Sequence, residues 1–119
     1  MKIESTSPAK VLDIQGTLAR LGGDRELLTD MTTFCLEDSP PLFAKIEAAV
    51  ASGDAQALRR AAHALKGLLL NSGGLRAANA ANLLEGAGQT GVLTNADDLV
   101  RSLAGELELL TDAIHTFRA

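Results

Sequence analysis

Aromatic residues and cysteine are nearly absent from this chain of 119 residues. It has no tryptophan, no tyrosine, three phenylalanines and one cysteine, Cys35. A single cysteine excludes a disulfide within the chain and a cysteine-based metal site. Hydrophobic residues make up 46% of the sequence, so the core must be aliphatic, mostly leucine and alanine. Both are strong helix formers, and the composition therefore favours an all-α domain.

Long apolar runs and an excess of positive charge are missing as well. No run approaches the roughly 20 apolar residues that a membrane-spanning helix needs. The N-terminus, MKIESTSPAK, lacks the apolar segment of a signal peptide. The net charge of −4 argues against nucleic acid as a partner. We expect a cytoplasmic protein that binds neither membrane nor nucleic acid, with residues 1–10 as a flexible lead-in and residues 11–119 as one domain.

Glycine, proline and aspartate divide the chain into segments with helical spacing of apolar residues. Ser39-Pro40-Pro41 should break or kink the second helix, in which Phe34 and Cys35 belong to the apolar pattern. Residues 86–94 should form a glycine-rich loop. Short connections imply antiparallel neighbours, and hence an antiparallel up-and-down four-helix bundle with a short extra N-terminal helix. The expected helices cover residues 11–21, 24–38, 42–52, 55–72, 75–87 and 95–117.

His63 is predicted to point away from the core. At about 100° per residue, Leu58, Ala62, Leu65 and Leu69 form one apolar stripe. His63 lies roughly 140° from Leu58 on the same helical projection. Gly67 follows one turn later on the exposed face, where an interior glycine costs about 1 kcal/mol relative to alanine. A missing side chain there would give a bulky group access to the imidazole.

Positive charge is concentrated around this histidine. No Asp or Glu occurs from residue 55 to residue 84, although the chain has fifteen acids. That stretch contains Arg59, Arg60, Lys66 and Arg76, a charge of +4. Such a patch attracts phosphate or an acidic partner, and an exposed Leu70 would add apolar docking surface. Lys66 is near enough in helical spacing to support an anion on the ring.

A neutral imidazole is a competent nucleophile near pH 7 and can accept a phosphoryl group. The sequence has no Gly-rich phosphate loop and no acidic Mg²⁺ cluster near His63. A phosphoryl donor would therefore have to bring the metal ion.

The segment AHALKG, followed by Gly73, resembles the H-x-L-K-G-S-S-x-x-x-G signature of histidine-containing phosphotransfer (Hpt) domains. The resemblance continues through the GGD turn, the acidic-Pro stretch and the GD step before the histidine helix, and through ANLLEGAG after it. It implies a four-helix bundle in a phosphorelay of two-component signal transduction.

The resemblance also implies roles for individual residues. His63 would be the phospho-accepting nucleophile, Lys66 would support the phosphate charge, and Gly67 would clear space. The chain would be a monomeric phosphoryl carrier without ATP-dependent kinase activity or a cofactor of its own. Its partner would be a response-regulator receiver domain, that of a hybrid sensor histidine kinase, and that partner would supply Mg²⁺. Docking would involve Arg59, Arg60, Leu70 and Arg76.

The sequence departs from the signature at Leu68 and Leu69, where small residues are usual. This departure leaves a second hypothesis open: an adaptor of the same fold that binds a receiver or kinase domain and is never phosphorylated. The phospho-accepting domain of a histidine kinase fits less well, because such domains usually have an acid directly after the histidine, and here Ala64 follows.

Overall fold

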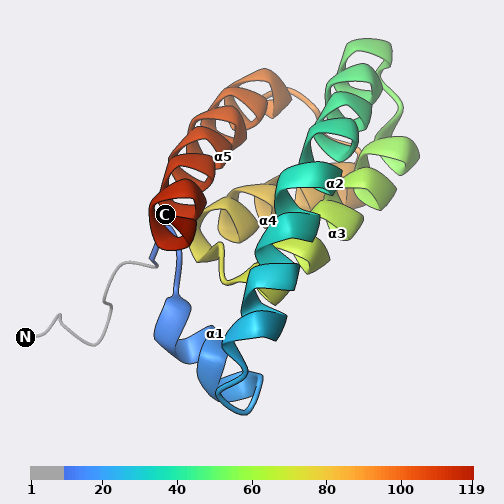
Figure 1. Ribbon diagram of the computed structural model, residues 1–119. Coiled ribbons are helices and arrows are strands. Elements are labelled where there is room, and N and C mark those ends of the chain that lie inside the picture. Colours follow the sequence, from blue (N-terminus) through green and yellow to red (C-terminus); the bar gives the residue numbers. More distant parts are fainter. Residues whose placement is uncertain (1–9) are drawn as a thin grey trace, which may run out of the picture.

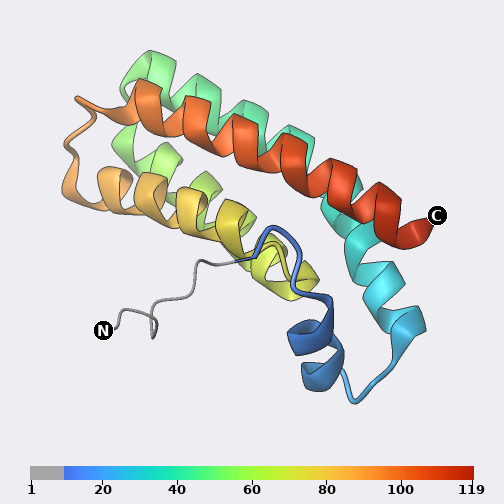
Figure 2. The ribbon, with the colours of Figure 1, turned by 90° about the vertical axis from the view of Figure 1, so that its left-hand side faces the viewer.

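The computed structural model describes residues 10–119, which form five α-helices and no β-strand (Figure 1). Four long helices form an up-and-down bundle, and the short first helix lies at one end of it (Figures 1 and 2). The predicted all-α bundle with an extra N-terminal helix is confirmed. The predicted lead-in falls outside the described residues, apart from Lys10. The helices are α1 Ile14–Arg20, α2 Arg25–Ser52, α3 Ala55–Ser72, α4 Leu75–Thr90 and α5 Ala96–Arg118.

Aspartates begin three of the helices, and glycines end three of them, α2, α3 and α4. The side chains of Asp13, Asp24 and Asp54 accept backbone N–H groups that have no partner within the helix, those of Gly16, Leu27 and Ala57. Gly53 and Gly73 end α2 and α3 in the left-handed conformation, with φ of 69° and 87°. The boundaries at Asp24, Gly53, Asp54 and Gly73 agree with the helix ends predicted from the sequence.

Helix α2 continues through Pro40 and Pro41, so of the predicted break or kink, the break is wrong. Ser39 is buried inside the helix, and its Oγ lies 3.6 Å from the Sγ of Cys35. Each proline removes one helix hydrogen bond. The helix persists because its buried residues before and after the prolines lie on one face; these are Leu28, Thr32, Cys35, Ile46 and Ala49.

The core is aliphatic, as the composition predicts. Its largest buried side chains are Leu28, Ile46, Leu58, Leu65, Leu69, Leu84, Leu103, Leu110 and Ile114. Phe34, by contrast, is 47% exposed, and the prediction that it is buried is wrong. It precedes the buried Cys35 by one residue, which turns it about 100° around α2. None of the described helices is long and apolar enough to cross a membrane.

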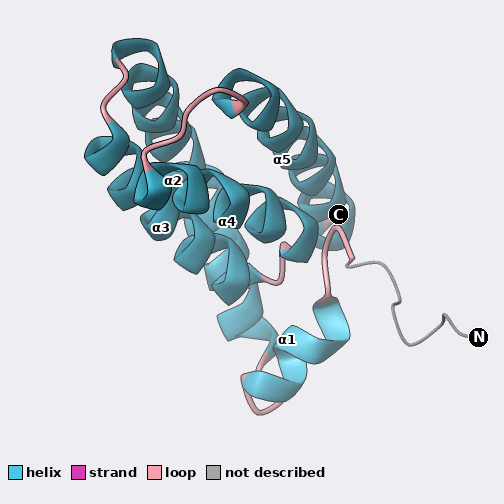
Figure 3. Cartoon of the chain, turned by 180° about the vertical axis from the view of Figure 1, so that it is seen from behind, coloured by secondary structure: helices cyan, strands magenta, loops and turns pink. Residues whose placement is uncertain are grey.

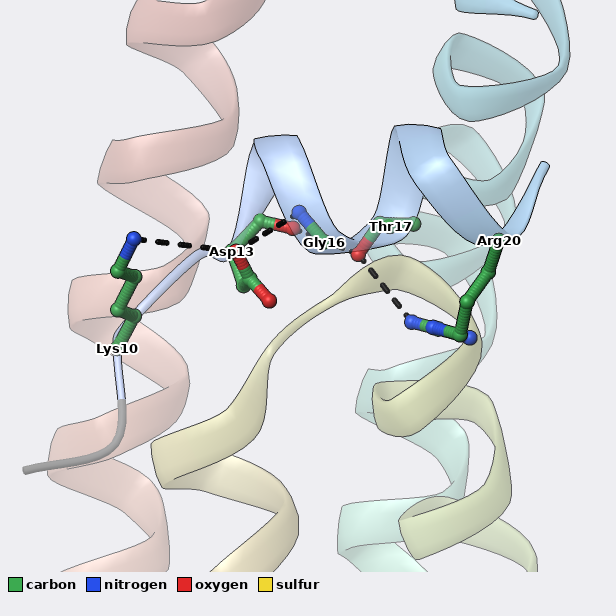
Figure 4. A network of polar contacts seen from close by, with 5 residues as sticks. All are labelled: Lys10, Asp13, Gly16, Thr17 and Arg20. Atoms are coloured by element: carbon green, nitrogen blue, oxygen red, sulfur yellow. Dashed lines mark hydrogen bonds and ion pairs between the residues drawn. The ribbon is translucent and has the colours of Figure 1, made fainter. Parts of the chain in front are cut away.

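Helix α1 is attached to the turn between α3 and α4. The backbone N–H of Asp13 donates to the carbonyl of Gly73 at 2.8 Å. Figure 4 shows that Thr17 and Arg20 lie against this turn, and Arg20 also donates to a carbonyl in the last turn of α3. A Cβ on Gly73 would collide with Thr17. Helix α1 is shorter than the predicted residues 11–21, because Asp13 caps it.

Helix α4 extends to Thr90, so the predicted loop over residues 86–94 is wrong in its first half. Gly88 is buried where α4 crosses α3, and a Cβ there would lie 2.6 Å from the backbone nitrogen of Arg59. Glycine at this position therefore lets the two backbones approach each other. At Gly86, nothing lies within 4 Å of the equivalent Cβ position.

This difference between two glycines of α4 gives a matched test of the packing. We expect Gly88→Ala to destabilise the fold by about 1–3 kcal/mol, as overpacking does. Gly86→Ala should stabilise it by up to about 1 kcal/mol through helix propensity. Urea unfolding of both variants and the wild type measures the two effects. If both variants changed the free energy of unfolding equally and in the same direction, the close approach at Gly88 would be contradicted.

Candidate functional site

His63 lies in the middle of α3 on its solvent side. The buried face of that helix consists of Leu58, Ala61, Ala62, Leu65, Leu69 and Ser72. The side chain of His63 is 68% exposed, in agreement with the outward direction predicted from the helical angles. A partner can therefore reach the imidazole without any rearrangement of the bundle.

Helices α3 and α4 lie side by side (Figure 3), joined by the Gly73–Gly74 turn, and their alignment brings an acid to the histidine. The Nδ1 atom of His63 lies 2.9 Å from the Oε2 atom of Glu85. An ionised carboxylate only accepts hydrogen bonds, so Nδ1 carries the proton of this contact. In the neutral ring, the lone pair is then on Nε2.

The same carboxylate also binds Lys66. The Nζ atom of Lys66 lies 2.6 Å from Oε1 of Glu85, and it donates to Oδ1 of Asn82 at 3.2 Å. The side chains of Lys66 and Glu85 are 26% and 17% exposed, so this ion pair is partly shielded from water. His63 and Lys66 are thus joined through one acidic group.

The contact with the Lys66 ammonium is the largest influence on Glu85 and lowers the pKa of its carboxyl below the ordinary value. Partial burial opposes this shift, and the contact with His63 adds to it. Glu85 is therefore ionised at neutral pH, which keeps it an acceptor for both neighbours.

Gly67 leaves open space next to the histidine. No atom lies within 4 Å of the position that a Cβ would occupy. The free chain would thus accommodate a larger residue there. Packing inside this protein does not explain the glycine, and a requirement for it would have to come from a bound partner.

The predicted partner-binding residues fall into two groups. Arg59, Arg60 and Leu70 are exposed on α3, the helix of His63. Arg76 is at the start of α4, nine residues before Glu85, which is about 13 Å along a helix. Its guanidinium donates to Oε2 of Glu106 on α5 at 2.9 Å. The fold therefore does not bring Arg76 to the histidine.

Glu85 and Asn82 are site residues that the sequence patterns do not identify. One signal was present: Glu85 is the first acid after the acid-free stretch of residues 55–84. Its partner could not be assigned without the alignment of α3 with α4. Within residues 10–119, no group of three His, Cys, Asp or Glu residues is arranged to hold a metal ion.

Comparisons with known proteins agree with this geometry. The family model described as "Hpt domain" matches residues 30–118. Among solved structures, the chain is similar to histidine-containing phosphotransfer protein B (HptB) from Pseudomonas aeruginosa PAO1, with 33% identity and a TM-score of 0.79. The match covers 93% of this chain and 96% of that one. No curated protein sequence matches the chain.

The lowered pKa of Glu85 makes its contribution to stability dependent on pH. The contribution should be present above about pH 5 and decline as the pH falls through the folded pKa, below the ordinary value of about 4.3 for Glu. Relative to the wild type, Glu85→Gln should lose up to about 1 kcal/mol at pH 7 and less at pH 3. Urea midpoints at both pH values measure this difference. A constant difference between the two proteins would contradict the ion pair.

Proposed function

The chain belongs to the Hpt family of histidine-containing phosphotransfer domains, and from this premise we propose that His63 accepts a phosphoryl group from the aspartate of a receiver domain and passes it on to another. The observation that supports this proposal is the exposed imidazole whose Nδ1 is occupied by Glu85, which leaves Nε2 as the free nucleophile. The chain would act as an intermediate of a phosphorelay.

The transfer balances without a net proton movement on this chain. The Nε2 lone pair of His63 attacks phosphorus, and a P–Nε2 bond forms as the P–O bond to the aspartate breaks. The electron pair of that bond returns to the aspartate carboxylate. Nδ1 keeps its proton, and Glu85 accepts its hydrogen bond throughout. The reverse sequence donates the group to the next receiver.

The other residues around His63 would assist by charge and by space. Lys66 would offset the negative charge of the phosphoryl oxygens, and Gly67 would leave room for the receiver beside the ring. Phosphoryl transfer depends mainly on positioning and electrostatic stabilisation. Arg59 and Arg60 would attract the acidic partner, and Leu70, 42% exposed, would give it an apolar contact. Arg76 is paired with Glu106 and is not part of the proposed docking surface.

The proposal assigns ATP chemistry to the partner. The chain would carry the phosphoryl group without a kinase activity of its own, and a hybrid sensor histidine kinase would deliver it through its receiver domain. Mg²⁺ bound to that receiver would neutralise charge on the phosphoryl oxygens during transfer.

The two leucines that follow Gly67, Leu68 and Leu69, do not obstruct the site. Leu69 is fully buried, and Leu68 is half-buried against the core. Neither side chain therefore occupies the space in front of His63. This packing favours the carrier over an adaptor that is never phosphorylated.

A transfer assay with a matched histidine control tests the function. A receiver domain charged with ³²P-phosphate is mixed with the wild type, His63→Gln and His115→Gln. His115 is exposed on α5, so its replacement changes the histidine content without touching the site. We expect label on the wild type and on His115→Gln, and none above background on His63→Gln.

Two results would contradict the assignment. Equal labelling of all three proteins would place the phosphoryl group elsewhere. Binding of the receiver without labelling of any protein, across the receivers of the source organism, would favour the adaptor.

A further inference from the structure

Lys66 contacts two oxygen atoms of α4 before any phosphoryl group arrives. Its ammonium contacts Oε1 of Glu85 at 2.6 Å and Oδ1 of Asn82 at 3.2 Å. An ammonium has three hydrogens to donate; one goes to Asn82, and the charge of the ammonium is paired with the carboxylate of Glu85. The residue that would support the phosphate is therefore bound to an anion of the protein itself.

The phosphoryl group would form next to this ion pair. His63 and Lys66 are three residues apart, and side chains at this spacing are neighbours on a helix. A phosphoryl group adds nearly two negative charges at neutral pH. It competes directly with the single charge of Glu85 for a mobile ammonium on a flexible stem.

Building on the proposed function, we propose that Lys66 exchanges partners during the phosphorelay: it pairs with Glu85 while His63 is free and moves to the phosphoryl group once His63 is charged. Glu85 stays on the Nδ1–H of His63 in both states and loses its cation in the charged state. Its side chain is only 17% exposed, so water compensates this loss poorly.

The exchange has a consequence for the direction of transfer. In the phosphorylated state, the carboxylate of Glu85 and the phosphoryl group are both negative and share the cation of Lys66. Donation of the phosphoryl group restores the ion pair of Glu85 and Lys66. Glu85 therefore lowers the affinity of His63 for the phosphoryl group and favours its onward donation.

A double-mutant cycle on the transfer equilibrium tests the exchange. The chain is mixed with a charged receiver that labels the wild type, and the ratio of phosphorylated chain to phosphorylated receiver is measured at equilibrium. The proteins are wild type, Glu85→Gln, Lys66→Met and the double variant. Glutamine retains an oxygen that accepts the Nδ1–H bond but removes the charge that competes for Lys66.

We expect Glu85→Gln to raise this ratio by about three- to tenfold, within the range of coupling between contacting residues. Lys66→Met should lower it. In the Lys66→Met background, the effect of Glu85→Gln should almost disappear, because no cation remains to be exchanged. Asn82→Ala, which removes the other contact of Lys66 without a change of charge, should raise the ratio by a smaller factor.

Glu106→Gln is the matched control, because Glu106 also forms an ion pair at 2.9 Å, with Arg76. It should leave the ratio unchanged. A gain from Glu85→Gln that persists without Lys66, a loss instead of a gain, or an equal gain from Glu106→Gln would each overturn the exchange. A wild type that no receiver labels would overturn the proposed function itself, a result distinct from these.

Discussion

The carboxylate of Glu85 is the group on which the arrangement of this site depends. One oxygen holds Nδ1 of His63, and the other holds the ammonium of Lys66. A surface histidine without such a neighbour would rotate freely and exchange its proton between both ring nitrogens. The acid fixes which nitrogen is available, and it does so from a different helix. The chemistry of α3 is therefore set by its packing against α4.

That packing has specific causes in the sequence. The buried Gly88 lets α4 approach the backbone of α3. The short Gly73–Gly74 turn joins the two helices directly. Helix α1 is attached to the same turn and to the end of α3 through Asp13, which donates to Gly73, and Arg20, which donates to the carbonyl of Leu70. Alanine and leucine fill the interface between the helices, so their distance is short and their alignment is well defined. The imidazole of His63 is therefore carried by a well-packed pair of helices, while its side chain remains exposed to solvent.

Local signals in the sequence predicted most helix ends and the direction of His63, because caps and helical angles depend on neighbouring residues. The incorrect predictions concern features that depend on contacts between helices. Pro40 and Pro41 do not break α2, since burial on both sides keeps it continuous, and Gly88 belongs to α4 because another helix lies against it. Glu85 was missed for the same reason: a contact between residues 22 positions apart requires the alignment of two helices, which no local pattern contains.

The central claim is that Glu85 keeps the proton on Nδ1 and leaves Nε2 of His63 to take the phosphoryl group. Long-range ¹H–¹⁵N NMR of the imidazole, recorded before and after phosphorylation, tests this most directly. We expect a protonated Nδ1 in both states and the phosphoryl group on Nε2. Phosphorylation at Nδ1, or a free ring protonated mainly at Nε2, would contradict the account.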